Sequence, residues 1–154
     1  MDALPTHPML VHLPLALGAL SPILCGAIGY AIGRRGAAET LWAWVVAAHF
    51  VLLASSGAAA LLGETDARRI QTRIDSEAVQ SHEDDGHRLL MACALAFGLA
   101  LAGLVLPKRR ARRAAMAAAF AASLICATLA VVAGHGGAVL VYQHGAAAAW
   151  SEPP

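Results

Sequence analysis

Four stretches of the chain carry no Asp, Glu, Lys or Arg, and short charged segments separate them. They cover residues 13–33, 41–63, 89–106 and 114–151. A helix needs about 20 largely apolar residues to cross a bilayer, within a range of about 17–25. The first three stretches therefore each predict one membrane-spanning helix. The fourth is too long for one span and too short for two, so we expect a span over 114–138 followed by an Ala- and Gly-rich segment in water.

The composition supports this interpretation. Hydrophobic residues make up 58% of the chain and charged residues 14%, whereas soluble domains have roughly 45–50% and about 25%. This excludes a water-soluble globule and a disordered chain. The net charge of +1 gives no electrostatic footprint for nucleic acid. We predict an all-α, integral membrane four-helix bundle in which residues 1–154 form a single domain among bilayer lipids.

The distribution of basic residues predicts the orientation. Two connections, at Arg34–Arg35 and at residues 108–113, hold seven of the eleven Lys and Arg residues. Basic loops stay in the cytoplasm, so both termini and the middle loop, 64–88, are expected on the outer side. Within that loop, Ile70 and Ile74 are spaced i, i+4 and Val79 follows, which predicts a short amphipathic surface helix.

Six of the seven histidines fall on the outer side in this topology: His7, His12, His82, His87, His135 and His144. We interpret His7 and His82 as solvated interface residues. His12, His87 and His135 each lie where a helix enters or leaves the apolar layer. Ionisable groups there usually face the bundle interior and mark a functional site. His49 lies within the second span, and we expect it to be hydrogen-bonded between helices.

The segment Gly134-His135-Gly136-Gly137 lets another group approach the backbone closely, either a neighbouring helix or a flat macrocycle. His135 and His144 are nine residues apart and point to opposite faces of a regular helix. They serve one compact site only if the glycines break the helix. The three cysteines, Cys25, Cys93 and Cys126, form no CxxC pair, and we expect them to pack as small hydrophobic side chains.

Two motifs mark the ends of the chain. The first is His7-Pro8-Met9-Leu10-Val11-His12-Leu13-Pro14, and the second is Gly136-Gly137-Ala138-Val139-Leu140-Val141-Tyr142-Gln143-His144-Gly145. With these motifs the chain resembles a bacterial membrane family catalogued as domain of unknown function 2231, which has HPxxVHFP-like and GGxLVYxHG-like motifs. Leu13 replaces the more usual Phe, and His87 also resembles the family pattern. The resemblance covers nearly the whole chain.

The resemblance implies a multi-pass protein of the bacterial inner (cytoplasmic) membrane. Relatives joined to, or encoded near, c-type cytochromes imply a redox setting. Our leading hypothesis is that the outer side of the bundle binds one or two molecules of haem b, with His12, His87, His135 and His144 as candidate axial ligands. The protein would relay electrons between a quinol and an outer carrier, or anchor a c-type cytochrome. Arg68, Arg69 or Arg88 could pair with the haem propionates.

Two other hypotheses remain. The same four histidines are also candidate ligands of a Zn or Cu site without haem. In one arrangement, His12, His87 and His144 form a mixed nitrogen and oxygen shell with Glu64 or Asp66. Alternatively, the chain is a non-catalytic subunit of a larger complex or homo-oligomer that associates through small-residue faces at 58–60 and 117–119. The chain has no Ser/His/Asp order, phosphate loop or paired buried carboxylates, which favours an electron-transfer or accessory subunit over a stand-alone enzyme.

Overall fold

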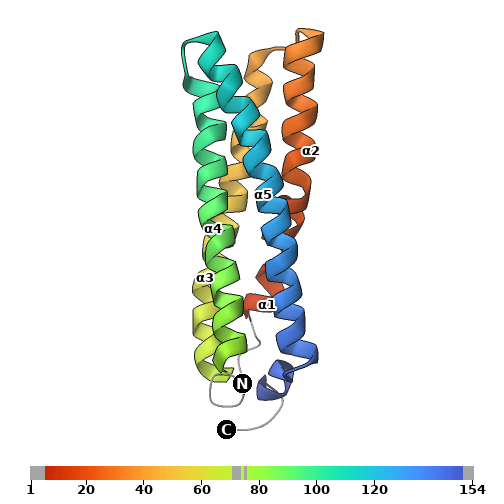
Figure 1. Cartoon of the computed structure of the whole chain (residues 1–154), viewed down its shortest axis with the longest axis vertical. Helices are drawn as coiled ribbons and strands as arrows, with labels where there is room; N and C mark the ends of the chain where they lie inside the picture. Colours follow the sequence, from red (N-terminus) through yellow and green to blue (C-terminus); the bar gives the residue numbers. More distant parts are fainter. Residues whose placement is uncertain (1–5, 71–73, 75, 151–154) are drawn as a thin grey trace.

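The computed structural model describes residues 6–70, 74 and 76–150 of the chain (Figure 1). It contains four long helices: α2 (His12–Arg35), α3 (Trp42–Ile70), α4 (Ser76–Val105) and α5 (Arg109–Tyr142). They pack side by side in the cyclic order α2, α3, α4, α5. Three short elements complete the described chain: α1 (Thr6–Leu10), η1 (Glu39–Leu41) and η2 (Ala146–Trp150). The expectation of an all-α fold with four membrane-spanning helices is confirmed.

The two ends of the bundle differ in chemistry. One end, called the arginine end below, carries η1 and the basic residues at 34–35 and 108–113. The other, called the histidine end, carries α1, η2, the last turns of α3 and the first turns of α4 (Figure 1). At the arginine end, Arg34 and Arg35 occupy the last turn of α2, where positive charge suits the helix dipole. Gly36 then ends the helix in the left-handed region at φ 66°.

The long helices have 24, 29, 30 and 34 residues, and the last three exceed the length that a bilayer requires. The uncharged part of α3 ends at Gly63 and that of α4 begins at Leu89. Residues 64–70 and 76–88 therefore extend beyond the membrane-spanning segments at the histidine end.

The expectation of a separate short helix in the middle loop is wrong, because α3 and α4 themselves continue into this region. The physical reason is a small apolar cluster at the histidine end, with buried members from α3, α4, α5 and η2: Ala67, Ile70, Val79, Leu140 and Ala146. The segment that follows the predicted fourth span also packs into this cluster. Helix α5 continues to Tyr142, and Gly145, at φ 71°, allows the chain to turn so that Ala146 is buried in this cluster.

Small side chains let the helices approach closely inside the membrane-spanning part. A Cβ on Gly18 of α2 would lie 3.0 Å from the Ala130 Cβ of α5. At the arginine end, the buried Trp42 donates a hydrogen bond from Nε1 to the Ala100 carbonyl oxygen over 2.9 Å. Ala59 and Ala119, from the two small-residue faces, are both buried. They pack within the bundle of this chain, as expected for small residues at helix contacts.

Candidate functional site

His7 is held at the histidine end by three contacts with α3, two from its ring and one from its backbone. Its Nδ1 lies 2.7 Å from the Ala59 carbonyl oxygen, and its backbone N–H donates to Asp66 Oδ2 over 3.3 Å. The ring also lies over Gly63, where a Cβ would come within 3.1 Å of it. Because a carbonyl oxygen only accepts, Nδ1 is the donor in this hydrogen bond. These contacts attach α1 to α3.

His82 of α4 lies beside His7. The two rings meet edge to face, with centroids 6.1 Å apart and an interplanar angle of 82°. On its other side His82 packs against α5, where a Cβ on Gly136 or Gly137 would lie 3.3 Å or 3.2 Å from the ring. Among the described residues, His82 Nδ1 is buried without a hydrogen-bond partner. His82 therefore connects α1 with α4 and α5.

The electrostatic environment of His82 favours the neutral ring. His82 belongs to the part of α4 that extends beyond the membrane-spanning segment. Burial lowers the pKa of its imidazole below the ordinary value, the nearby His7 lowers it further, and Asp85 opposes both effects. Asp85 in turn accepts a hydrogen bond from Arg88 over 2.8 Å. An unprotonated imidazole is the form that can bind a metal or a haem iron.

An open groove of about 500 Å³ lies between α4 and α5 at the histidine end. The α4 wall includes His82 and Asp85, and the α5 wall includes His135 and Gly136. The remaining lining is mainly apolar and consists of Ala78, Ser81, Val131, Val132, Val139 and Leu140. The groove therefore has imidazoles on both facing helices and an otherwise largely hydrocarbon surface.

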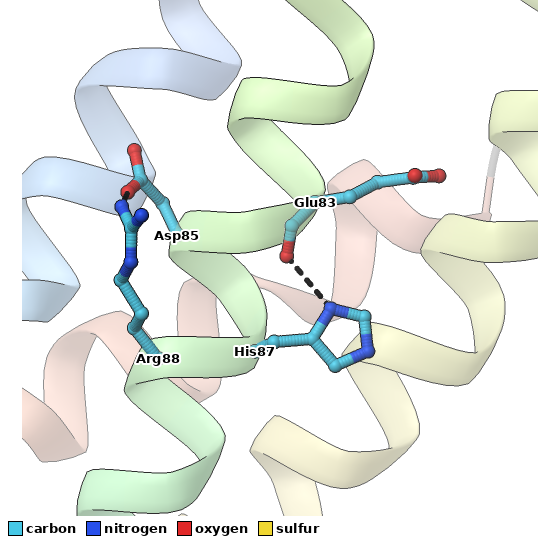
Figure 2. A network of polar contacts seen from close by, with 4 residues as sticks. All are labelled: Glu83, Asp85, His87 and Arg88. Carbon is cyan, nitrogen blue, oxygen red and sulfur yellow. Dashed lines mark hydrogen bonds and ion pairs between the residues drawn. The ribbon is translucent and has the colours of Figure 1, made fainter.

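Of the four histidines predicted as ligands, His135 lies in this groove. All four are exposed, and His12, His87 and His144 do not line the groove. Figure 2 shows Asp85 and Arg88 on one side of α4 and His87 on the other. The His87 Nδ1 is 2.9 Å from the Glu83 carbonyl oxygen of its own helix. Within the described part of the chain, no hydrogen bond, ion pair or ring contact joins any two of the four predicted ligands.

Helix α5 is continuous through Gly134, Gly136 and Gly137. His144 follows the end of this helix and is exposed. The glycines thus do not break the helix, which is the condition on which a shared site for His135 and His144 depended. Across residues 6–70, 74 and 76–150, no group of three or more His, Cys, Asp or Glu side chains is arranged to hold a metal ion.

Two histidines that the sequence indicated as solvated are the best-connected ones. The interpretation of His7 and His82 as solvated interface residues is wrong, because both rings contact other helices. The available signal was the pair Gly136-Gly137, which indicates that something approaches the backbone of α5 closely. The group that approaches the backbone of α5 is the ring of His82. His49 also differs from expectation: it is fully buried, but its Nδ1 bonds to the Val45 carbonyl oxygen of its own helix over 2.8 Å.

These observations define a multi-spanning membrane protein with a histidine-lined groove at one end of a four-helix bundle. The model of the family described as "Predicted membrane protein (DUF2231)" matches residues 3–149, and the chain belongs to this family. Neither a curated protein nor a solved structure matches the chain. The two motifs at opposite ends of the sequence meet in the fold, because His7 of the first and Gly136–Gly137 of the second both contact His82.

Proposed function

We propose that this protein binds haem b in the groove between α4 and α5 and serves as an electron-transfer or cytochrome-anchoring subunit of the membrane. One observation carries the proposal: His82 and His135, from facing helices, both line a largely apolar groove of about 500 Å³. Helix bundles build cofactor sites from side chains on facing helices in this way. When bound, haem b would supply a one-electron carrier.

The residues of the groove fit the requirements of a haem. An axial ligand needs an imidazole nitrogen with a free lone pair, and His82 and His135 are the candidates. Val131, Val132 and Leu140 offer an apolar wall, and Gly136 adds no side chain to it. Arg88 projects on the same side of α4 as Asp85 (Figure 2), which lines the groove, so its guanidinium could pair with a propionate. His7 and Asp85 would hold the ring of His82 in position.

The location of the groove supports an outer-face electron partner. With the basic connections in the cytoplasm, the histidine end lies on the outer side of the bacterial inner membrane. A cofactor there would lie near the end of the membrane-spanning segments, within reach of a quinol in the bilayer and a c-type cytochrome outside it.

The test is optical. The protein is purified in detergent, the cofactor-free fraction is titrated with haemin, and spectra are recorded in the oxidised state and after dithionite. We expect a Soret band that saturates at one haem per chain and shifts on reduction. His135→Ala or His82→Ala should weaken binding at least tenfold or change the spectrum. His87→Ala is the matched control, because His87 is on the same helix as His82 and lies outside the groove.

Three outcomes would contradict the proposal. A folded protein that does not take up haemin has no haem site. Spectra that change with His87→Ala and not with His135→Ala or His82→Ala would move the site out of the groove. A colourless protein with stoichiometric zinc or copper would favour the hypothesis of a metal site without haem. A protein that binds neither haem nor metal would favour the hypothesis of a non-catalytic subunit.

A further inference from the structure

The arginine end of the bundle carries a large excess of positive charge. Seven Lys and Arg residues from the two basic connections meet there. Glu39 is the acid of these connections, and it forms an ion pair with Arg112. Within the described part of the chain, neither Arg34 of α2 nor Arg113 of α5 makes an ion pair. Their guanidinium groups are therefore available to an anion from outside the chain.

Helices α2 and α5 pack against each other next to these charges. A Cβ on Gly26 of α2 would lie 3.3 Å from the Phe120 Cε2 of α5, so these two residues mark the contact. The residues that precede them, Cys25 and Ala119, are both buried in one apolar cluster, so the interior of the bundle lies on that side. Phe120 itself is 39% exposed. Its ring therefore lies on the lipid-facing side of the seam between α2 and α5.

Arg113 and Arg34 are both exposed and lie at a similar depth beside this seam. Arg113 precedes Phe120 by seven residues, so it lies on the same face of α5, about 10 Å closer to the arginine end. Arg34 follows Gly26 by eight residues, which is about 12 Å in the same direction because the two helices are antiparallel. Arg34 is also about 180° around α2 from the buried Cys25. Two cationic side chains from neighbouring helices thus flank the lipid-facing side of the seam.

The surface next to the two arginines is apolar and aromatic. On α2, Ile23 and Tyr30 share an exposed face with Arg34, because their spacings of seven and four residues correspond to whole helical turns. The guanidinium of Arg35 lies 5.6 Å from the centre of the Tyr30 ring. Tyrosine is enriched at the membrane–water interface, which indicates that the arginines lie at the level of the lipid headgroups. The seam therefore offers positive charge at headgroup level and a hydrocarbon surface directly below it.

We propose that Arg34 and Arg113 hold the phosphate of one anionic phospholipid at this seam, with its acyl chains along Phe120 and Ile23. Each guanidinium can donate two hydrogen bonds to a phosphate group. Basic pockets between membrane-spanning helices bind acidic lipid headgroups in the same way. A zwitterionic lipid fits less well, because its ammonium group is repelled by the unpaired cations. The site lies at the opposite end of the bundle from the proposed haem groove, so the two proposals can fail separately.

The experiment measures lipid binding by native mass spectrometry. Delipidated full-length protein in detergent is titrated with dioleoyl-phosphatidylglycerol. A second titration uses dioleoyl-phosphatidylcholine, which has the same acyl chains and phosphodiester but no net charge. A third uses glycerophosphoglycerol, which is the same anionic headgroup without acyl chains and stands for a free phosphate. We expect one molecule of the anionic lipid to bind at least about fivefold more tightly than either alternative.

Single substitutions assign the site to the two arginines. Arg34→Gln and Arg113→Gln should each weaken binding of the anionic lipid about fivefold, because each removes one charge at the membrane surface. Arg113→Lys keeps the charge and should retain most of the affinity. Lys108→Gln is the matched control, since it removes one charge from the same end but lies five residues, about 140° around the helix, from Arg113. The control should bind like the wild type.

Three results would overturn the proposal. Equal binding of the two lipids would show that the seam does not select for negative charge. Equal binding of the headgroup with and without acyl chains would indicate a site for a free phosphate and not for a lipid. An equal loss of affinity in Lys108→Gln and Arg113→Gln would indicate general attraction to the charge of this end and no site at the seam.

Discussion

The imidazole of His7 meets the imidazole of His82 edge to face, with ring centroids 6.1 Å apart. The contact joins α1 to α4, and each ring also rests on a glycine of another helix, His7 on Gly63 and His82 on Gly136–Gly137. A larger residue at these positions would displace the rings, so the glycines are part of the arrangement. The pair therefore ties the first and last motifs of the chain into one structure at the histidine end.

Replacing His7 with alanine should destabilise the protein. The substitution removes the hydrogen bond to the Ala59 carbonyl oxygen and the contact with His82. One hydrogen bond contributes about 1 kcal/mol, and a buried group left without its partner costs about 1–3 kcal/mol. We expect His7→Ala to lower the thermal midpoint in detergent by several degrees. His12→Ala is the control; His12 is exposed, so a comparable loss in that variant would show that the His7 contacts do not matter.

The stability of the protein should depend on pH through His82. Burial and His7 lower the pKa of this ring in the folded state from the ordinary 6.5, while Asp85 opposes the shift. The unfolded chain therefore takes up the proton at a higher pH than the folded chain does. The neutral His82 ring makes its full contribution to the free energy of unfolding above about pH 6.5, and this contribution is lost as the pH falls below that value.

The measurement compares thermal midpoints of wild-type protein and His82→Gln between pH 8 and pH 5. The advantage of the wild type should shrink as the pH falls, because glutamine does not titrate. The same substitution at the exposed His87 provides the reference. A difference between wild type and His82→Gln that stays constant over the whole range would show that His82 does not titrate with folding.

The number of helices could be predicted from the sequence because the bilayer imposes a simple requirement. An uncharged stretch of about 20 residues crosses the bilayer as a helix, which satisfies its backbone hydrogen bonds internally. The helix ends at the histidine end did not follow from it. Ile70, Val79 and Leu140 continue the helices into water because each finds apolar partners on other elements. Ile70 and Leu140, for example, are 70 residues apart in the sequence, so no local pattern reveals such partners.

The prediction that His82 is solvated was wrong for a related reason. His82 and His87 are five residues apart, about 140° around a helix, so at most one of them can face α5. Which one does so depends on the rotation of α4 about its axis, and that rotation is set by packing against α3 and α5. The depth of each histidine could be read from the sequence, whereas the direction of its side chain could not.

The orientation of the bundle can be tested by labelling. The basic residues at the arginine end predict that this end is cytoplasmic. A cysteine introduced at Gln80, which is exposed at the histidine end, should react with a membrane-impermeant maleimide in intact spheroplasts. A cysteine at Thr40, exposed at the arginine end, should react only after permeabilisation. The native cysteines are buried and should give little background. Labelling of Thr40→Cys, and not of Gln80→Cys, in intact spheroplasts would reverse the orientation and place the groove in the cytoplasm.

Two glycines of α4, five residues apart, should respond oppositely to alanine. A Cβ on Gly103 would lie 2.8 Å from the Trp42 Nε1 and 2.9 Å from the Met116 Cγ. Met116 can move, but Trp42 is 1% exposed and its Nε1 is bonded to Ala100. Gly103→Ala must therefore displace the indole or separate α3 from α4, and such overpacking costs about 1–3 kcal/mol.

Gly98 is exposed, and a Cβ added to it would have no neighbouring side chain or helix within 4 Å. Alanine favours a helix over glycine by up to about 1 kcal/mol, so Gly98→Ala should raise the thermal midpoint or leave it unchanged. Gly103→Ala should lower it by several degrees. Thermal unfolding of both variants in the same detergent measures the difference. Equal midpoints would show that Trp42 does not hold α3 and α4 at the close distance that Gly103 permits.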